Sequence, residues 1–242
     1  MVKKYLLIVL AGLTLAGCAS TPDDEWADPR DPFEDFNRDM WDFNEQLDEA
    51  ILWPAAKAYG EIPQPVRTGL RNVADNLDEV SWFVNNLLQG KVMDAGSTFW
   101  RFSINSTVGV LGIFDVATPL GIEAKEESFG ETLASWGVTE GPYVMLPGLG
   151  PTVPIDRGGD VVDGMYFPID NLNGPTSIAR LLVKALDTRL RLQEQQALME
   201  NSLDPYGFVK EAYFQNWQHK VYDGNPPQTE ADELDDDFYD QF

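Results

Sequence analysis

The sequence predicts an all-α domain built from successive amphipathic helices. Three observations predict it. Apolar residues recur at spacings of three and four in segment after segment, proline and glycine stand where these segments begin and end, and one apolar stretch has turn residues at both ends. Residues three and four apart share one face of a helix, so the pattern indicates helices joined by tight turns. The stretch at 141–151 is instead expected to form a hairpin-like loop.

Residues 1–17 have the pattern of a lipoprotein signal peptide. Lys3 and Lys4 precede an apolar run that is too short to span a bilayer, and Leu15-Ala16-Gly17-Cys18 closes it. This ending resembles the bacterial lipobox, which implies cleavage before Cys18 and acylation of its sulfur and its new amino group. The alternative for Cys18, the only cysteine, is a free or buried thiol. Ala19 follows where inner-membrane lipoproteins typically carry aspartate, so the outer membrane is the expected destination.

The charge balance excludes some partners. The chain has 40 acidic and 17 basic residues, a formal net charge of −23, which phosphate backbones and anionic lipid surfaces would repel. Nucleic acid is therefore not an expected partner, and any membrane contact beyond the lipid anchor should be apolar. We expect residues 18–30 to form a flexible tether, 31–224 a helical domain and 225–242 an acidic, disordered tail.

The first helix is expected to start at Asp31-Pro32-Phe33-Glu34, which suits a capped helix start, and to run to about Leu52. Its apolar face could contact a protein core. The alternative is contact with lipid, because a single small core seldom absorbs so many aromatic residues. The aromatic residues concerned are Phe33, Phe36, Trp41, Phe43 and Trp53.

Helical patterns continue over 65–77 and again over 80–88, which ends at Gly90. The run 98–114 has one charge, Arg101, and is slightly short for a transmembrane helix. It could be a buried central helix. Alternatively, one face contacts lipid while a polar row contacts an aqueous lumen, and that row consists of Ser103, Asn105, Ser106 and Thr107.

The next segments mix turns and helices. A short helix is expected over 128–138, and the hairpin-like loop after it should pack inside the protein or contact lipid or another protein. The glycine-rich segment 157–164 lacks the lysine of a phosphate-binding loop and is expected to be a flexible connector. Two helices follow, over about 176–199 and 204–224. The acidic tail could solubilise the protein or dock a basic periplasmic partner.

The sequence gives no support for an enzyme. His219 is the only histidine, there is no Gly-x-Ser-x-Gly motif, and no second histidine or cysteine could complete a zinc site. We therefore expect no catalytic residue, no metal and no cofactor.

Ordered motifs along the chain resemble the MlaA (VacJ) outer-membrane lipoproteins. They are Asp31-Pro32-Phe33-Glu34, Phe36-Asn37-Arg38, Phe43-Asn44, Pro63-Gln64-Pro65-Val66-Arg67, Asn85-Asn86-Leu87-Leu88-Gln89-Gly90, Asn105-Ser106-Thr107, Phe129-Gly130-Glu131-Thr132-Leu133, Trp136-Gly137-Val138, Gly141-Pro142-Tyr143, Leu146-Pro147, Gly159-Asp160, Asp204-Pro205-Tyr206 and Glu211-Ala212-Tyr213-Phe214. The resemblance covers the chain from the signal to about Phe214. One departure is Pro154-Ile155-Asp156-Arg157, where the family usually has a Leu-Arg-Asp order.

The resemblance implies a ring of amphipathic helices lying in the periplasmic leaflet of the outer membrane, beside a trimeric porin. Phospholipid misplaced in the outer leaflet would enter a channel through the ring. It would then pass to a soluble periplasmic carrier, which maintains lipid asymmetry. The alternative from another class is a lipid-anchored scaffold without a lipid path.

A lipid path gives the candidate residues their roles. A headgroup needs a polar route while its tails stay in apolar surroundings. The path candidates are Ser103, Asn105, Ser106, Thr107, Phe33, Phe36, Asn37, Phe43 and Asn44. The candidates for a gating or membrane loop are Gly141, Pro142, Tyr143, Leu146, Pro147 and Gly150.

Overall fold

The computed structural model describes residues 28–166 and 168–227, and these form the predicted all-α fold. Its elements are α2 (Glu34–Leu47), the π-helical η2 (Asp48–Leu52), α3 (Trp53–Gly60), α4 (Gln64–Leu88), α5 (Val92–Thr107), η3 (Thr118–Leu120), α6 (Phe129–Ser135), β1 (Val144–Leu146), β2 (Gly150–Thr152), α7 (Pro154–Asp163), η4 (Ile169–Asn171), α8 (Gly174–Glu200) and α9 (Pro205–Val221). Within these residues no helix is both long and apolar enough to cross a membrane.

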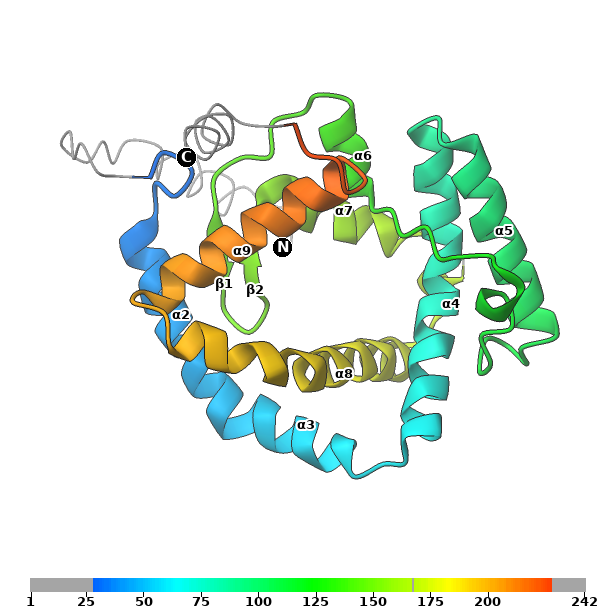
Figure 1. The fold of residues 1–242 in the computed structure, drawn as a ribbon, viewed down its shortest axis with the longest axis horizontal. Coiled ribbons are helices and arrows are strands. Elements are labelled where there is room, and N and C mark those ends of the chain that lie inside the picture. Colours follow the sequence, from blue (N-terminus) through cyan, green and yellow to red (C-terminus); the bar gives the residue numbers. More distant parts are fainter. Residues whose placement is uncertain (1–27, 167, 228–242) are drawn as a thin grey trace, which may run out of the picture.

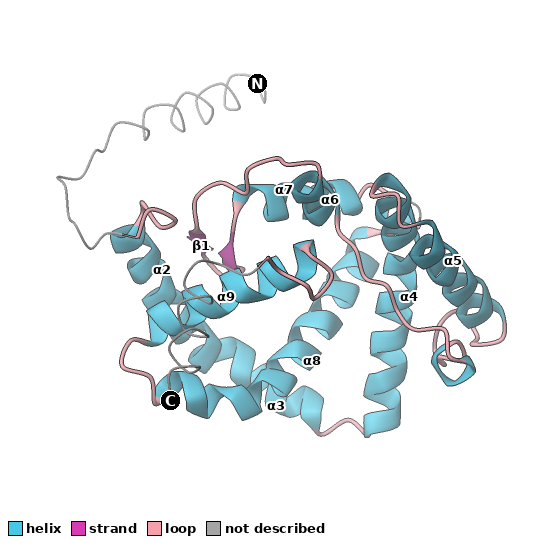
Figure 2. Cartoon of the chain, turned by 45° about the horizontal axis from the view of Figure 1, so that its top comes forward, coloured by secondary structure: helices cyan, strands magenta, loops and turns pink. Residues whose placement is uncertain are grey.

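The helices follow one another around a ring (Figure 1). From α2 the chain continues through η2 and α3 to α4, which packs along α5. The chain then returns by way of α6 and α7, and α8 and α9 complete the circuit by contacting α3, α4 and α6. Figure 2 shows α4 and α5 side by side from a second direction.

The first helix is longer than its pattern predicts. It was expected to end near Leu52, but the chain remains helical through η2 and α3 to Gly60. Pro54 stands in the first turn of α3 and has no N–H to donate to the turn before it. The π-helical turn η2 connects α2 to α3 without a break in the helix. Similarly, the two expected segments 65–77 and 80–88 form the single helix α4.

The glycine-rich segment 157–164 is not a flexible connector, because residues 157–163 lie within α7 and Gly164 caps its end. The reason is close helix packing. A Cβ atom added to Gly159 would lie 2.2 Å from the backbone nitrogen of Gly130 on α6, and one added to Gly130 would lie 2.9 Å from Cα of Asp156. The two glycines therefore allow α6 and α7 to cross almost backbone to backbone. Ser128 and Glu131 form a capping box at the start of α6.

The predicted hairpin is present as β1 and β2, which pair antiparallel with Met145 opposite Pro151. The main apolar core surrounds this hairpin. Its buried members are Tyr143, Met145, Val153, Ile155, Tyr206, Phe214 and Trp217. The core thus joins the hairpin to the start of α7 and to α9, with Met40 and Trp41 of α2 packed against it.

Candidate lipid path

Large apolar side chains lie mainly on the outside of the described part of the chain. Outside the core around the hairpin, the buried apolar residues are mostly alanines, whereas many large apolar side chains are exposed. The exposed aromatic residues include Phe33, Phe36, Phe43, Phe99, Trp100, Phe114 and Trp136. Monomeric proteins in water rarely expose so much apolar surface. Exposed apolar surface of this kind is typical of contact with lipid or with another protein.

Charged side chains occupy the interior between α4 and α5. Glu79 of α4 is 1% exposed and Arg101 of α5 is 7% exposed. Nε of Arg101 donates to Oε1 of Glu79 at 2.7 Å, and one terminal nitrogen donates to Thr118 and to the carbonyl of Ile122. Burial raises the pKa of the Glu79 carboxyl to about 7, although Arg101 opposes this rise.

Asn105, a predicted path residue, holds the segment that follows α5. It is 4% exposed, and its Nδ2 donates to Oδ1 of Asp115 at 3.1 Å. Its Oδ1 accepts from the backbone N–H groups of Val116 and Ala117. Because both ends of the amide are already bonded, Asn105 fixes the chain between α5 and η3.

The hydroxyl groups of α5 bond to their own helix. Oγ of Ser103 donates to the carbonyl of Phe99 at 2.8 Å, and Oγ1 of Thr107 donates to the carbonyl of Ser103 at 2.7 Å. Ser106 instead accepts from Nδ2 of Asn76 on α4 at 2.9 Å. A hydroxyl satisfied within its own helix tolerates apolar surroundings. The four predicted polar residues therefore do not form one row, since Asn105 and Ser106 contact α4 or the following loop.

Ion pairs join α8 to the rest of the ring. Asp78 of α4 pairs with both Arg180 and Lys184 of α8. Further along α8, Arg189 makes two parallel bonds of 2.8 Å to the carboxylate of Asp48 in η2. Arg180 and Lys184 thus contact the polar side of α4, and Arg189 contacts η2.

A second buried polar cluster joins the end of α4 to α6 and α7. Nδ2 of Asn85 donates to Asp163 at 2.8 Å, and Thr132 donates to Oδ1 of Asn85. Glu127 accepts from Lys91 and from Gln89, each at 2.6 Å. Burial raises the pKa of Glu127 to about 7, although Lys91 opposes this rise.

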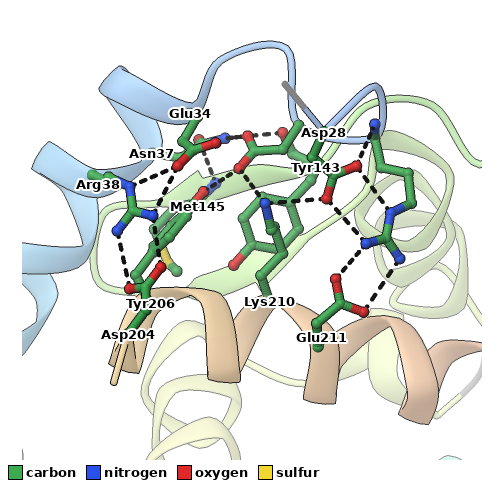
Figure 3. A network of polar contacts seen from close by, with 12 residues as sticks. Asp28, Glu34, Asn37, Arg38, Tyr143, Met145, Asp204, Tyr206, Lys210 and Glu211 are labelled. Atoms are coloured by element: carbon green, nitrogen blue, oxygen red, sulfur yellow. Dashed lines mark hydrogen bonds and ion pairs between the residues drawn. The ribbon is translucent and has the colours of Figure 1, made fainter. Parts of the chain in front are cut away.

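Asn37 connects α2 to the hairpin from a fully buried position (Figure 3). Its Nδ2 donates to Asp31 at 2.7 Å and to the carbonyl of Tyr143 at 3.1 Å, and its Oδ1 accepts from the N–H of Met145 at 2.8 Å. Asp31 also accepts from Tyr206 and Lys210 of α9. The start of the domain, the hairpin and α9 therefore share one network.

Asn44 holds the other end of the hairpin. Its Nδ2 donates to the carbonyl of Leu146 at 2.9 Å, and its Oδ1 accepts from the N–H of Gly148 at 2.6 Å. Asn37 and Asn44 lie seven residues apart, two helical turns, so they follow one face of α2. The two predicted path residues thus act as clamps that fix the hairpin against α2.

The predicted loop residues have different surroundings. Tyr143 is fully buried in the core and therefore contacts no lipid. Gly141, Pro142, Leu146 and Gly150 are partly buried, whereas Pro147 is exposed together with Gly148 and Leu149. The tip of the hairpin, residues 147–149, is thus the most exposed part of this loop.

The segment 108–114 after α5 combines exposure with backbone strain. Val110 and Leu111 have φ angles of 55° and 57°, which β-branched and bulky residues rarely adopt. Both side chains are exposed, as are Val108, Ile113 and Phe114. We call residues 108–114 the apolar tip. A strained turn that exposes apolar side chains is typical of a site shaped for contact.

Sequence reasoning overlooked the polar face of α4. Asn72, Asp75, Asn76 and Glu79 recur at spacings of three and four, which places them on one side of the helix. In the sequence, these amide and carboxylate residues occupy positions between the apolar residues of the same helix. Cys18 and most of the acidic tail lie outside the described residues, so the predicted anchor and tail stay predictions.

Comparison with known proteins gives a consistent set of relatives. A family model described as "MlaA lipoprotein" matches residues 29–220. The intermembrane phospholipid transport system lipoprotein MlaA of Haemophilus influenzae is 38% identical over 97% of this chain and 96% of its own length. The protein of the same name from Escherichia coli K12 is 39% identical over 89% of this chain and 87% of its own length.

A solved structure shares the fold. It was described under the words "Structural basis for maintenance of bacterial outer membrane lipid asymmetry". It superposes with a TM-score of 0.75 at 39% identity, over 81% of this chain and 99% of the solved one.

Proposed function

Because this chain belongs to the MlaA lipoprotein family, we propose that it removes misplaced phospholipid from the outer leaflet of the outer membrane and so maintains lipid asymmetry. The MlaA relatives named above are intermembrane phospholipid transport lipoproteins, and the similar solved structure concerns outer-membrane lipid asymmetry. The family and the fold thus support the same transport function.

One observation carries the proposal. The ring leaves many large apolar side chains exposed and buries charged and amide side chains between its helices, a distribution that is unusual for a protein dissolved in water. A phospholipid needs both kinds of surroundings, apolar and polar. Its acyl chains are stable beside apolar side chains, whereas its headgroup needs polar partners or water. A ring of this composition can lie in a leaflet and offer the headgroup a polar route.

We assign the proposed roles by placement. Phe33, Phe36 and Phe43 are exposed and would contact acyl chains, as would the apolar tip. Ser106 and the polar side of α4 would contact the headgroup route. The hairpin tip at Pro147 would gate the opening, held in position by Asn37 and Asn44.

The attachment and partners belong to the same proposal. The lipobox at Cys18 would anchor the chain on the periplasmic side of the outer membrane, with the tether leading to Asp31. We propose a trimeric porin beside the ring and a soluble periplasmic carrier as acceptor of the lipid, as the family resemblance implies. The transport needs no catalytic residue of this chain.

Outer-leaflet phospholipid measured on intact cells tests this function. A membrane-impermeant amine reagent would quantify it in cells that lack the native protein and receive a variant. Leu149→Asp at the hairpin tip should raise the labelled phospholipid severalfold, because charge at the gate opposes passage of lipid. The control is Leu203→Asp, which also changes an exposed leucine in a loop.

The control should leave the labelled phospholipid low, and both variants should reach wild-type levels in the membrane. A scaffold without a lipid path predicts no difference between the two variants. Equal labelling in cells with and without the wild-type protein would refute the transport function itself.

A further inference from the structure

A pocket between α4, α5 and the chain that follows α5 carries more negative than positive charge. Its volume is about 190 Å³. Its lining includes the carboxylates Asp75, Glu79, Asp115 and Glu126 against the single guanidinium of Arg101. Asp75 also pairs with Arg71, and Arg101 is shared between Glu79 at 2.7 Å and Asp115 at 3.4 Å, so one guanidinium faces several carboxylates in the pocket.

Two buried oxygens of residues that line this pocket have no partner. They are Oε2 of Glu79, whose residue is 1% exposed, and Oδ1 of Asn76, whose residue is 6% exposed. Arg101 does not satisfy them, since four of its five N–H groups donate to the other Glu79 oxygen, Thr118, Ile122 and Asp115, and neither oxygen accepts from it. A buried acceptor without a donor is costly, so both oxygens favour a ligand that brings N–H or O–H groups.

The chemistry points to an ammonium group rather than a metal ion. Within the described residues no three carboxylate, histidine or cysteine side chains are placed to hold a metal. A primary ammonium has three N–H donors, enough for both unpartnered oxygens and a third acceptor. A quaternary ammonium has no N–H and could satisfy neither of them. The pocket volume corresponds to about six water molecules, which is sufficient for an aminoethyl group.

The surroundings indicate where such an ammonium would come from. The apolar tip flanks the pocket, since Nδ2 of Asn72 donates to the carbonyl of Ile113 at 3.2 Å. A Cβ atom added to Gly112 would lie 2.6 Å from Cβ of Asn76, so the tip and the pocket are in direct contact. Leu111 and Phe114 of the tip are exposed beside it. An acidic pocket next to an apolar surface matches a lipid with a cationic headgroup.

We propose that this pocket binds the primary ammonium of a phospholipid headgroup of the ethanolamine type. Glu79 and Asn76 accept hydrogen bonds from the ammonium, while Glu126 at the exposed rim adds negative charge. The acyl chains lie along the apolar tip, and the phosphate stays outside the pocket, where the carboxylates do not repel it. This inference rests on the proposed function, because it selects among lipids that the protein already transports.

Lipid retention by the purified, full-length lipoprotein tests the headgroup preference. The protein would be exposed to vesicles with equal amounts of ethanolamine, choline and glycerol headgroups on identical acyl chains, in EDTA, and the retained lipid quantified by mass spectrometry. We expect about tenfold enrichment of the ethanolamine lipid over the choline lipid, as expected for charge-assisted hydrogen bonds.

Variants test whether this pocket, and not another acidic surface, causes the enrichment. Glu79→Gln should remove the enrichment, whereas Asn76→Asp should preserve or increase it, because it adds an acceptor of the same shape. Glu49→Gln is the matched control, since Glu49 is exposed on η2 far from the pocket lining. Circular dichroism checks that each variant is folded. If Glu79→Gln does not fold, loss of the enrichment in Glu126→Gln replaces it.

Each outcome decides the inference. Equal retention of the three lipids overturns it and leaves the transport function intact, whereas failure to retain any phospholipid contradicts both. An enrichment that requires divalent cations, and so vanishes in EDTA, also overturns it. Free ethanolamine that binds as tightly as the lipid would assign the pocket to a soluble amine instead of a headgroup.

Discussion

At the scale of single residues, asparagine is the side chain on which this structure depends. Asn37, Asn44, Asn85 and Asn105 each bond two separate segments through both ends of the amide. Their presence in motifs was visible in the sequence, but their role was not. An amide in a sequence indicates a polar site equally well whether water, a lipid headgroup or the backbone is its partner, and only the fold decides between them.

Asn37→Ala tests the clamp on the hairpin. The change removes the Asn37 bonds to Oδ1 of Asp31, to the Tyr143 carbonyl and to the Met145 N–H, so the free energy of unfolding should fall by about 3 kcal/mol. Hydrogen exchange of residues 144–152 should accelerate as well. Asn44→Ala on α2, which removes bonds to the more exposed end of the hairpin, should lower the free energy of unfolding by only about 1 kcal/mol. An equal loss in the two variants would contradict the assigned roles.

The raised pKa of Glu127 predicts that the free energy of unfolding depends on pH. Its pKa in the folded chain is about 7 because of burial, above the ordinary 4.5, with Lys91 opposing the rise and Glu131 adding to it. The folded state then binds more protons than the unfolded state between these values. Stability from this group is therefore present at low pH and is lost as pH rises from about 4.5 to 7.

Chemical denaturation in detergent at pH 5 and pH 7.5 would measure that loss. Glu127→Gln should reduce the difference between the two pH values by about 1 to 3 kcal/mol. Part of the difference should remain, because Glu79 titrates in the same range and direction. A variant with an unchanged pH dependence would show that Glu127 ionises normally.

At the scale of elements, the sequence predicted helices and the hairpin well. Spacing, proline and glycine located α6, α8 and α9 closely and the start of α2, whereas α5 spans Val92–Thr107 instead of the expected run 98–114. The prediction failed at α7, where Gly158 and Gly159 indicated a connector although a close crossing with α6 is the reason for the glycine at 159. Helix propensity depends only on the residues of one segment. The residue that Gly159 crosses, Gly130, lies 29 residues earlier, so the local pattern does not reveal it.

The apolar tip gives a prediction for its element. Leu111→Cys, labelled with a nitroxide, should place the label within the hydrocarbon, with high accessibility to oxygen and low accessibility to a water-soluble quencher. An acylated Cys18 would leave the introduced cysteine as the only free thiol. Asp42→Cys, an exposed position of α2 about 100° around the helix from Phe43, is the control and should report water or headgroups. A label at residue 111 that is as accessible to the water-soluble quencher as the control would show that the tip lies in water.

At the scale of the whole molecule, the ring exposes apolar side chains and is joined by polar contacts. Asp78 and Asp48 pair with α8 away from the apolar core, and Asp204 pairs with Arg38 of α2 beside it, so ion pairs join the helices around the circuit. Periodicity predicted the two faces of each helix but not what each face contacts. Contact with lipid and contact with a core both require the same apolar pattern, and the alternatives separate only once the helices are arranged.

Photo-crosslinking along residues 99–114 tests the central claim, that phospholipid passes through a ring with an apolar outside and a polar route. A photoreactive residue at each position in turn would be irradiated in cells, and the lipid adducts identified by mass spectrometry. We expect acyl-chain adducts at Phe99 and Trp100 and headgroup adducts at Ser106, on the side of α5 that contacts α4. Adducts confined to the apolar positions, with none at Ser106, would show that the protein rests in the membrane without conducting lipid.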